Sequence, residues 1–269
     1  MTRQWKFTAL EFIVLCDQYR GGSLPRPFQF VSDEEITVDE LERRKRVTWE
    51  ELRHRLDGSF DGVLEVLRAP ELFVRVSSWD ELDMYNMAKE QRLHAARAGA
   101  LAYLFEQAPT LLTYDTPAFT ITECDPRRLA TAVIDSLPPM PAGRLPDIPI
   151  VTDSAEHITP TTGRSYVEDD REDAPVFRTQ QFFQQRAVRT GAIMVVQGRS
   201  KFGPRGIHET AMMWRDVAGD GRYVMALDAA PIAVGTSREM LIERIRADID
   251  NLMRRLETHW ESGRPEDRY

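Results

Sequence analysis

The stretch from Thr190 to Trp260 constrains the fold more than any other part of the sequence. It contains short apolar runs separated by Gly- and Asp-rich segments, a pattern typical of antiparallel strands joined by tight connections. Asp220-Gly221 suits such a turn because glycine accepts a positive φ angle. The stretch ends in apolar residues at helical spacing, and Thr236-x-x-Glu239 predicts the start of that helix. We therefore expect a β-meander closed by an amphipathic helix.

A similar order of elements occurs earlier in the chain. Residues from Leu93 to Leu137 predict a strand, a hairpin around Ala98-Gly99, a further strand and a helix capped by Asp125. Residues from Ala192 to Leu256 repeat that order. We therefore expect an α+β protein with two similar halves, residues 1–150 and 175–269. The spacing leaves open whether the two sheets merge.

The segment between the halves, residues 151–174, differs in composition. It is polar and ends in the acidic run from Glu168 to Asp173. Such a segment buries too little apolar surface to offset the entropy of ordering it, so we expect a mobile linker. Its boundaries divide the chain into an N-terminal half, a linker and a C-terminal half.

Composition and charge exclude several classes of protein. The 269 residues carry a formal net charge of -8, which argues against nucleic acid as the main partner because phosphate binding needs a basic surface. No run approaches the roughly 20 apolar residues of a membrane span, and the first residues do not resemble a signal peptide. The two cysteines, Cys16 and Cys124, stand alone. We therefore expect a cytoplasmic protein.

The chemistry-bearing residues form no recognisable catalytic or metal-binding motif. The five histidines lack metal-ligand spacing, and neither cysteine lies in a nucleophile motif. The Gly-rich segments lie between strands, where hairpin turns explain them, and the acidic residues occur in runs typical of solvated surfaces. We expect no catalytic residue, no cofactor and no metal ion.

The unusual residues are apolar. Trp79, Met84 and Tyr85 lie between Ser78 and Gln91, a charged segment that is either a helix or a long exposed loop between strands. Trp214 lies on a strand that carries large apolar groups on both faces. These residues either fill the core or form a surface that binds a partner protein, where Trp, Tyr, Met and Arg are enriched.

Several short motifs occur in a fixed order across nearly the whole chain. They are Leu93-His-Ala-Ala-Arg-Ala-Gly99, Asp125-Pro-Arg-Arg-Leu129, Leu137-Pro-Pro-Met-Pro-Ala-Gly-Arg144, Trp214-Arg-Asp216 and Gly221-Arg-Tyr223. In order and spacing they resemble the EspG family, the cytosolic chaperones of type VII (ESX) secretion, although Ala142 stands where the family often has proline.

The resemblance implies a central antiparallel sheet with pseudo-two-fold symmetry, flanked by helical bundles. It also implies a non-catalytic protein that binds the PPE subunit of a PE–PPE heterodimer. The contacts would come from the loop between the second and third strands, from the central sheet and from the C-terminal helix. The residues expected at these places are Trp79, Asp83, Tyr85, Arg97, Arg199 and Trp214.

Two other functions stay open at this point. One is a small-molecule enzyme, which predicts a deep pocket holding carboxylates or histidines with perturbed pKa values. The other is a scaffold that acts by self-association, and the sequence does not decide between a monomer and a dimer.

Overall fold

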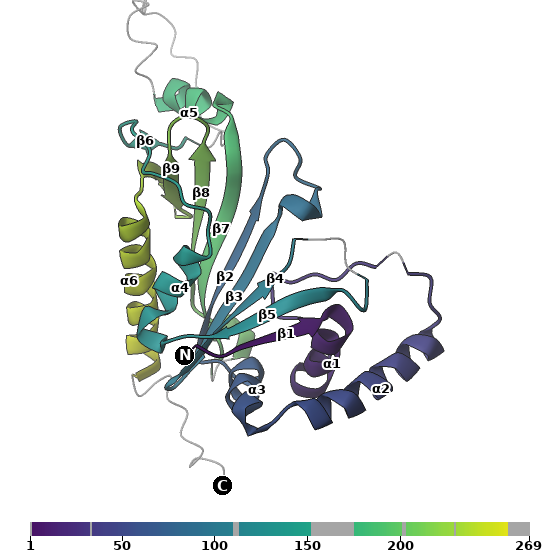
Figure 1. Cartoon of the computed structure of the whole chain (residues 1–269). Coiled ribbons are helices and arrows are strands. Elements are labelled where there is room, and N and C mark those ends of the chain that lie inside the picture. Colours follow the sequence, from purple (N-terminus) through teal and green to yellow (C-terminus); the bar gives the residue numbers. More distant parts are fainter. Residues whose placement is uncertain are drawn as a thin grey trace, which may run out of the picture.

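The computed structural model describes residues 2–32, 34–109, 113–151, 175–200, 203–228 and 230–257. These residues form one ten-stranded sheet with the order β1-β5-β4-β3-β2-β7-β8-β9-β10-β6, and neighbouring strands pair antiparallel (Figure 1). The expected α+β class is confirmed. The two halves share the sheet, because β2 pairs with β7 at its centre.

The N-terminal half contributes the first five strands and four helices. They are β1 (Gln4–Thr8), α1 (Ala9–Arg20), α2 (Val38–Arg55), α3 (Asp61–Arg68), β2 (Leu72–Trp79), β3 (Gln91–Ala98), β4 (Leu101–Gln107), β5 (Pro117–Glu123) and α4 (Leu129–Asp135), with 3₁₀ turns η1 (Gly58–Phe60), η2 (Met87–Lys89) and η3 (Pro126–Arg128). The remaining elements are β6 (Ile148–Pro149), α5 (Pro175–Gln184), β7 (Ala187–Gln197), η5 (Gly203–Gly206), β8 (Glu209–Val217), β9 (Arg222–Ala226), β10 (Ile232–Gly235) and α6 (Arg238–Glu257).

The internal repeat is one strand longer than the sequence indicates. Four strands form a meander outwards from the centre and a helix follows, first as β2 to β5 with α4 and then as β7 to β10 with α6. The repeat therefore begins at Leu72 rather than at Leu93. An outer strand completes each half, β1 beside β5 and β6 beside β10.

The helices cover the two faces of the sheet differently. Helices α4 and α6 pack against each other and against the centre of one face, over a core that includes Val74, Leu93 and Ile193. On the opposite face, α1, α2 and α3 cover the N-terminal strands and Phe182 of α5 packs on the C-terminal ones. The central strands are therefore fully covered on one face and bordered by helices on the other (Figure 1).

Local signals explain where the helices begin. Thr8 and Glu11 form a complete capping box at α1, and Asp125 accepts a hydrogen bond from the backbone of Arg127 at the turn before α4. The expected cap of α6 is displaced by one residue, because the hydroxyl of Thr236 donates to the carbonyl of Val234 at 2.7 Å. Ser237 caps the helix instead, accepting from the backbone of Met240 at 3.2 Å.

The predicted linker lies outside the described residues, apart from Val151. The chain on its two sides meets at one side chain. Thr179 of α5 donates a hydrogen bond to the carbonyl of Pro149 at 2.8 Å and accepts one from the backbone of Val151 at 3.1 Å. The start of α5 is thereby held beside β6.

Candidate interaction surface

Half-buried side chains line the middle of the sheet on the face opposite α4 and α6. Alternate residues of a strand face opposite sides of a sheet, so the residues that flank the buried Val74 and Val76 along β2 point away from these helices. We call these side chains the open strip: Phe73, Arg75, Ser77 and Trp79 of β2, Ala192 and Met194 of β7, and Ala211 and Met213 of β8.

The segment between β2 and β3 extends the open strip into solvent. It is a loop, Asp80–Glu90, with a single 3₁₀ turn, so the ambiguity left by its sequence is settled. Three of its apolar side chains are largely exposed: Tyr85 at 91%, Leu82 at 72% and Met84 at 51%. Apolar groups concentrated on one exposed segment mark a candidate binding surface.

Polar contacts within this loop fix its shape. Asp80 accepts from the backbone of Leu82 at 2.9 Å, and Lys89 contacts both Asp80 at 3.0 Å and Asp83 at 3.1 Å. Asp83 also accepts from the side-chain amide of Asn86 at 2.8 Å, and the hydrogen bonds from Asn86 and Lys89 lower its pKa. Asp83 therefore acts within the loop and shapes it.

A buried arginine ties the base of the loop to the C-terminal half. Arg215 of β8 donates two hydrogen bonds of 2.7 Å to the carboxylate of Glu81, and Thr190 of β7 donates a third. Burial alone would raise the pKa of Glu81, but the hydrogen bonds from Arg215 and Thr190 outweigh it and lower the pKa. A bidentate arginine–carboxylate pair is geometrically specific, so it positions the loop.

The same arginine holds the end of α5. Arg215 donates to the carbonyls of Phe182 at 2.7 Å and Gln185 at 3.0 Å, and its guanidinium lies 5.1 Å from the ring of Phe183. One side chain thus joins β8, the β2–β3 loop and α5. The sequence offers no signal for this contact, because Glu81 and Arg215 lie 134 residues apart.

The six expected partner-binding residues do not form one patch. Trp79, Asp83 and Tyr85 lie together at the end of β2 and in its loop. Arg97 pairs with Leu72 at the other end of that strand, about 23 Å away at ~3.3 Å per residue. Arg199 lies at that far end too, because Gln197 also pairs with Leu72.

Trp214 lies in the core, so a partner protein cannot contact its side chain. Its side chain has 0% exposure and faces α4 and α6. The ring packs over Gly191, where an added Cβ would come within 2.2 Å of it. The sequence shows large apolar groups on both sides of β8 but does not show which side the helices cover.

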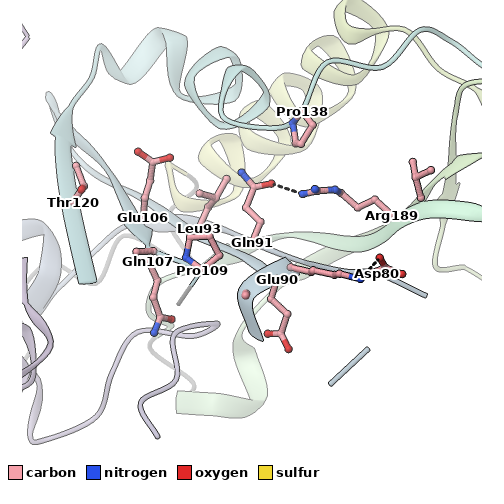
Figure 2. Close-up of a pocket in the computed structure, with 14 residues that line it drawn as sticks. Asp80, Glu90, Gln91, Leu93, Glu106, Gln107, Pro109, Thr120, Pro138 and Arg189 are labelled. Atoms are coloured by element: carbon pink, nitrogen blue, oxygen red, sulfur yellow. Dashed lines mark hydrogen bonds and ion pairs between the residues drawn. The ribbon is translucent and has the colours of Figure 1, made fainter. Parts of the chain in front are cut away.

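A hollow lies on the face of the sheet that carries α4. It has a volume of ≈ 550 Å³, and Gln91, Glu106, Pro138 and Arg189 are among its lining residues. Figure 2 shows Gln91 and Arg189 pointing toward each other, and their side chains are 3.4 Å apart. Burial raises the pKa of Glu106, and a hydrogen bond with Ser136 opposes the shift.

The described residues contain no grouping of three or more His, Cys, Asp and Glu side chains that would hold a metal ion. Burial raises the pKa of Cys16 and of Cys124 to about 12, so both are protonated thiols near neutral pH. Burial lowers the pKa of His94 to about 4, which keeps it neutral. Across the same described part of the chain, every helix is too short or too polar to cross a bilayer.

Comparisons with known proteins agree with this architecture. The profile of the EspG family matches residues 8–235. Among solved structures, the type VII secretion system chaperone EspG5 of Mycobacterium tuberculosis, in complex with the PE25–PPE41 dimer, has a similar fold. The TM-score is 0.55 and the identity 13%, over 92% of this chain and 96% of the other. No curated protein sequence matches the chain.

Proposed function

The chain belongs to the EspG family, and on that premise we propose that it is a cytoplasmic, non-catalytic chaperone for type VII secretion. Its client is a PE–PPE heterodimer, bound through the PPE subunit. The structural likeness to a chaperone solved with such a dimer supports this proposal. The observation that carries it is the exposed apolar β2–β3 loop beside the open strip.

The surface suits a client with an apolar tip. Removing side chains such as Leu82 and Met84 from water contributes about 1.5–3 kcal/mol each when burial is complete. The bond between Glu81 and Arg215 holds the loop before binding, so less conformational entropy is lost on association. Covering the tip keeps the client from aggregating until export.

The family premise and the protonation states support a function without catalysis. Both thiols are protonated near neutral pH and His94 is neutral, so none of the three is an activated nucleophile or a charged acid. The hollow in Figure 2 would be the place for a small-molecule substrate. Of its three acidic residues, Asp80 pairs with Lys89, Glu90 pairs with Arg92, and Glu106 has a hydrogen bond with Ser136.

Co-expression with PE–PPE heterodimers from the same genome tests the proposal. The chain should co-purify with at least one heterodimer as a defined complex. The double variant Trp79→Ala, Tyr85→Ala should lose most of this binding, because truncating aromatic anchors is costly at an interface.

Val38→Ala is the matched control, since Val38 is an exposed apolar residue on α2. It should bind as the wild-type chain does. A well-folded chain that leaves every heterodimer insoluble would contradict the proposal, and so would a double variant that binds with unchanged affinity.

A further inference from the structure

A groove crosses the open strip where it meets the β2–β3 loop. It has a volume of ≈ 720 Å³, and its walls include Phe28, Trp79, Met84 and Met194. Ser77 and Ala192 pair across β2 and β7 between these walls and give the groove a low floor. The space therefore accommodates large side chains from another protein.

The groove is basic although the chain is acidic. Three arginines, Arg26, Arg75 and Arg92, line it together with one acidic residue, Glu90. Glu90 forms an ion pair with Arg92, which is itself buried. Arg26 and Arg75 remain, and the acidic partner of Arg75, Glu209, lies outside the lining of the groove, in a protein whose net charge is -8.

Arg75 has unused capacity to bind an anion. The side chain is 19% exposed, and its contacts run through Nη2, to Sδ of Met194 at 3.3 Å and to Glu209 at 3.4 Å. The contact with Glu209 is longer than the ~2.7–2.9 Å of strong charged hydrogen bonds, and the thioether sulfur of Met194 is a weak, uncharged acceptor. Within the described part of the chain, its buried Nε has no hydrogen-bond partner.

The surroundings of Arg75 disfavour a lone positive charge. Burial lowers its pKa; the charge of Glu209 opposes the shift and that of Arg26 adds to it. Glu209 is half exposed, so water weakens its attraction for the guanidinium. A partner docked in the groove would remove the remaining water, which is unfavourable unless a counter-charge arrives with it.

We propose that the groove takes an apolar segment of the client that carries an aspartate or glutamate, and that Arg75 binds the carboxylate of that residue. This inference rests on the proposed function. The apolar part packs on Trp79, Met84 and Met194. The carboxylate meets the part of the guanidinium that still faces water. An uncharged segment would leave Arg75 desolvated without compensation, so the groove selects clients by charge as well as by shape.

The first experiment measures the affinity of the wild-type chain and its variants for a co-purified PE–PPE heterodimer at low and high NaCl. Arg75→Gln should weaken binding about tenfold or more and flatten the salt dependence. Arg75→Lys keeps the charge but not the planar guanidinium, so it should retain part of the affinity. Arg43→Gln on α2 is the control, since Arg43 forms only an exposed ion pair with Glu40.

The second experiment does not depend on the client. Two small probes, 4-phenylbutyrate and its neutral analogue 4-phenylbutanol, are titrated into the full chain while the arginine Nε–H resonances are followed by NMR. The resonance absent from the Arg75→Gln spectrum should shift with the acid and not with the alcohol. Equal responses to both probes, or no response to the acid, would overturn the proposal.

The two experiments separate this inference from the proposed function. If the heterodimer binds the wild-type chain and Arg75→Gln equally at both salt concentrations, the carboxylate proposal fails while the chaperone proposal stands. If no heterodimer binds but the acid probe alone shifts Arg75, the chaperone proposal fails while the anion-binding groove stands.

Discussion

The loop from β2 to β3 and the loop from β7 to β8 occupy equivalent positions in the two halves. They are equal in length, Asp80–Glu90 and Gly198–His208, and lie at opposite ends of the sheet because β2 and β7 run antiparallel. The first presents exposed apolar residues, whereas the second is rich in Gly and basic residues.

The two loops are also held in different ways. Side chains anchor the β2–β3 loop, through Glu81 and Arg215. The other loop is anchored without an ion pair: the amide of Gly198 donates to the carbonyl of Glu71 at 2.8 Å, and the side-chain amide of Gln197 donates to the carbonyl of Arg199 at 2.7 Å. A pseudo-symmetric scaffold thus carries two distinct surfaces. The loop tied by an ion pair is the one that exposes large apolar side chains.

The largest expected effect comes from breaking the side-chain anchor. Glu81→Gln leaves the buried Arg215 without its counter-charge, and we expect a loss of about 3 kcal/mol in the free energy of unfolding. Urea denaturation measures it. Lys89→Met removes only an exposed pairing in the same loop and should cost less than about 1 kcal/mol. Equal losses of unfolding free energy in Glu81→Gln and Lys89→Met would show that the Glu81–Arg215 pair stabilises the fold no more than an exposed ion pair does.

Breaking the backbone anchor should have the next largest effect. At Gly198 an added Cβ would lie 1.8 Å from the carbonyl oxygen of Pro70, so the backbone of Gly198→Ala must shift, at a cost of about 2 kcal/mol. Gly203→Ala is the control in the same loop. It has open space and only a positive φ of 68°, so about 1 kcal/mol is expected. Thermal melts of the two variants would show whether Gly198→Ala loses more stability than Gly203→Ala.

Acid should weaken the side-chain anchor and not the backbone one. The folded-state pKa of Glu81 lies below its unfolded value, so its stabilisation is complete above about pH 5 and is lost as the pH falls through the folded pKa. The stability difference between wild type and Glu81→Gln should therefore shrink in acid. The difference between wild type and Gly198→Ala should stay constant over the same range, since no carboxylate takes part.

The smallest effects on stability should come from exposed residues at the two ends. Tyr85→Ser and Arg199→Ser should each change the free energy of unfolding by less than about 0.5 kcal/mol, because both side chains are exposed. The affinity for the client should distinguish the two variants, because Tyr85→Ser should bind the client more weakly and Arg199→Ser should bind it as the wild-type chain does. Weakened binding in both variants would mean that the client reaches both ends of the sheet.

Local patterns predicted most of the elements but not their arrangement. In the sequence, the alternation from Glu71 to Ser77 predicts a strand with Phe73 and Arg75 on the side opposite Leu72, and Thr8-x-x-Glu11 predicts the start of a helix; the structure has both, as β2 and α1. Strand β1 was missed because five residues before a helix give too short a pattern. The central pairing of β2 with β7 joins segments more than a hundred residues apart, and no local preference encodes it.

The candidate site was less predictable from the sequence than the elements were. The sequence left open whether Tyr85 and Trp214 fill the core or lie at the surface. Tyr85 is exposed on its loop, whereas α4 and α6 cover the side of β8 that carries Trp214. Arg75 was assigned to the correct face without a function, because its value depends on the groove that Arg26 and Phe28 complete from a distant part of the chain.

The meeting of Thr179 with Pro149 and Val151 has a practical consequence. The described chain up to residue 151 and from residue 175 onwards meets at adjoining points, and the entropy of closing a loop between two such points changes only slowly with its length. Extra sequence placed there would not pull on the sheet. This junction is therefore the natural position for a fluorescent reporter or an affinity handle.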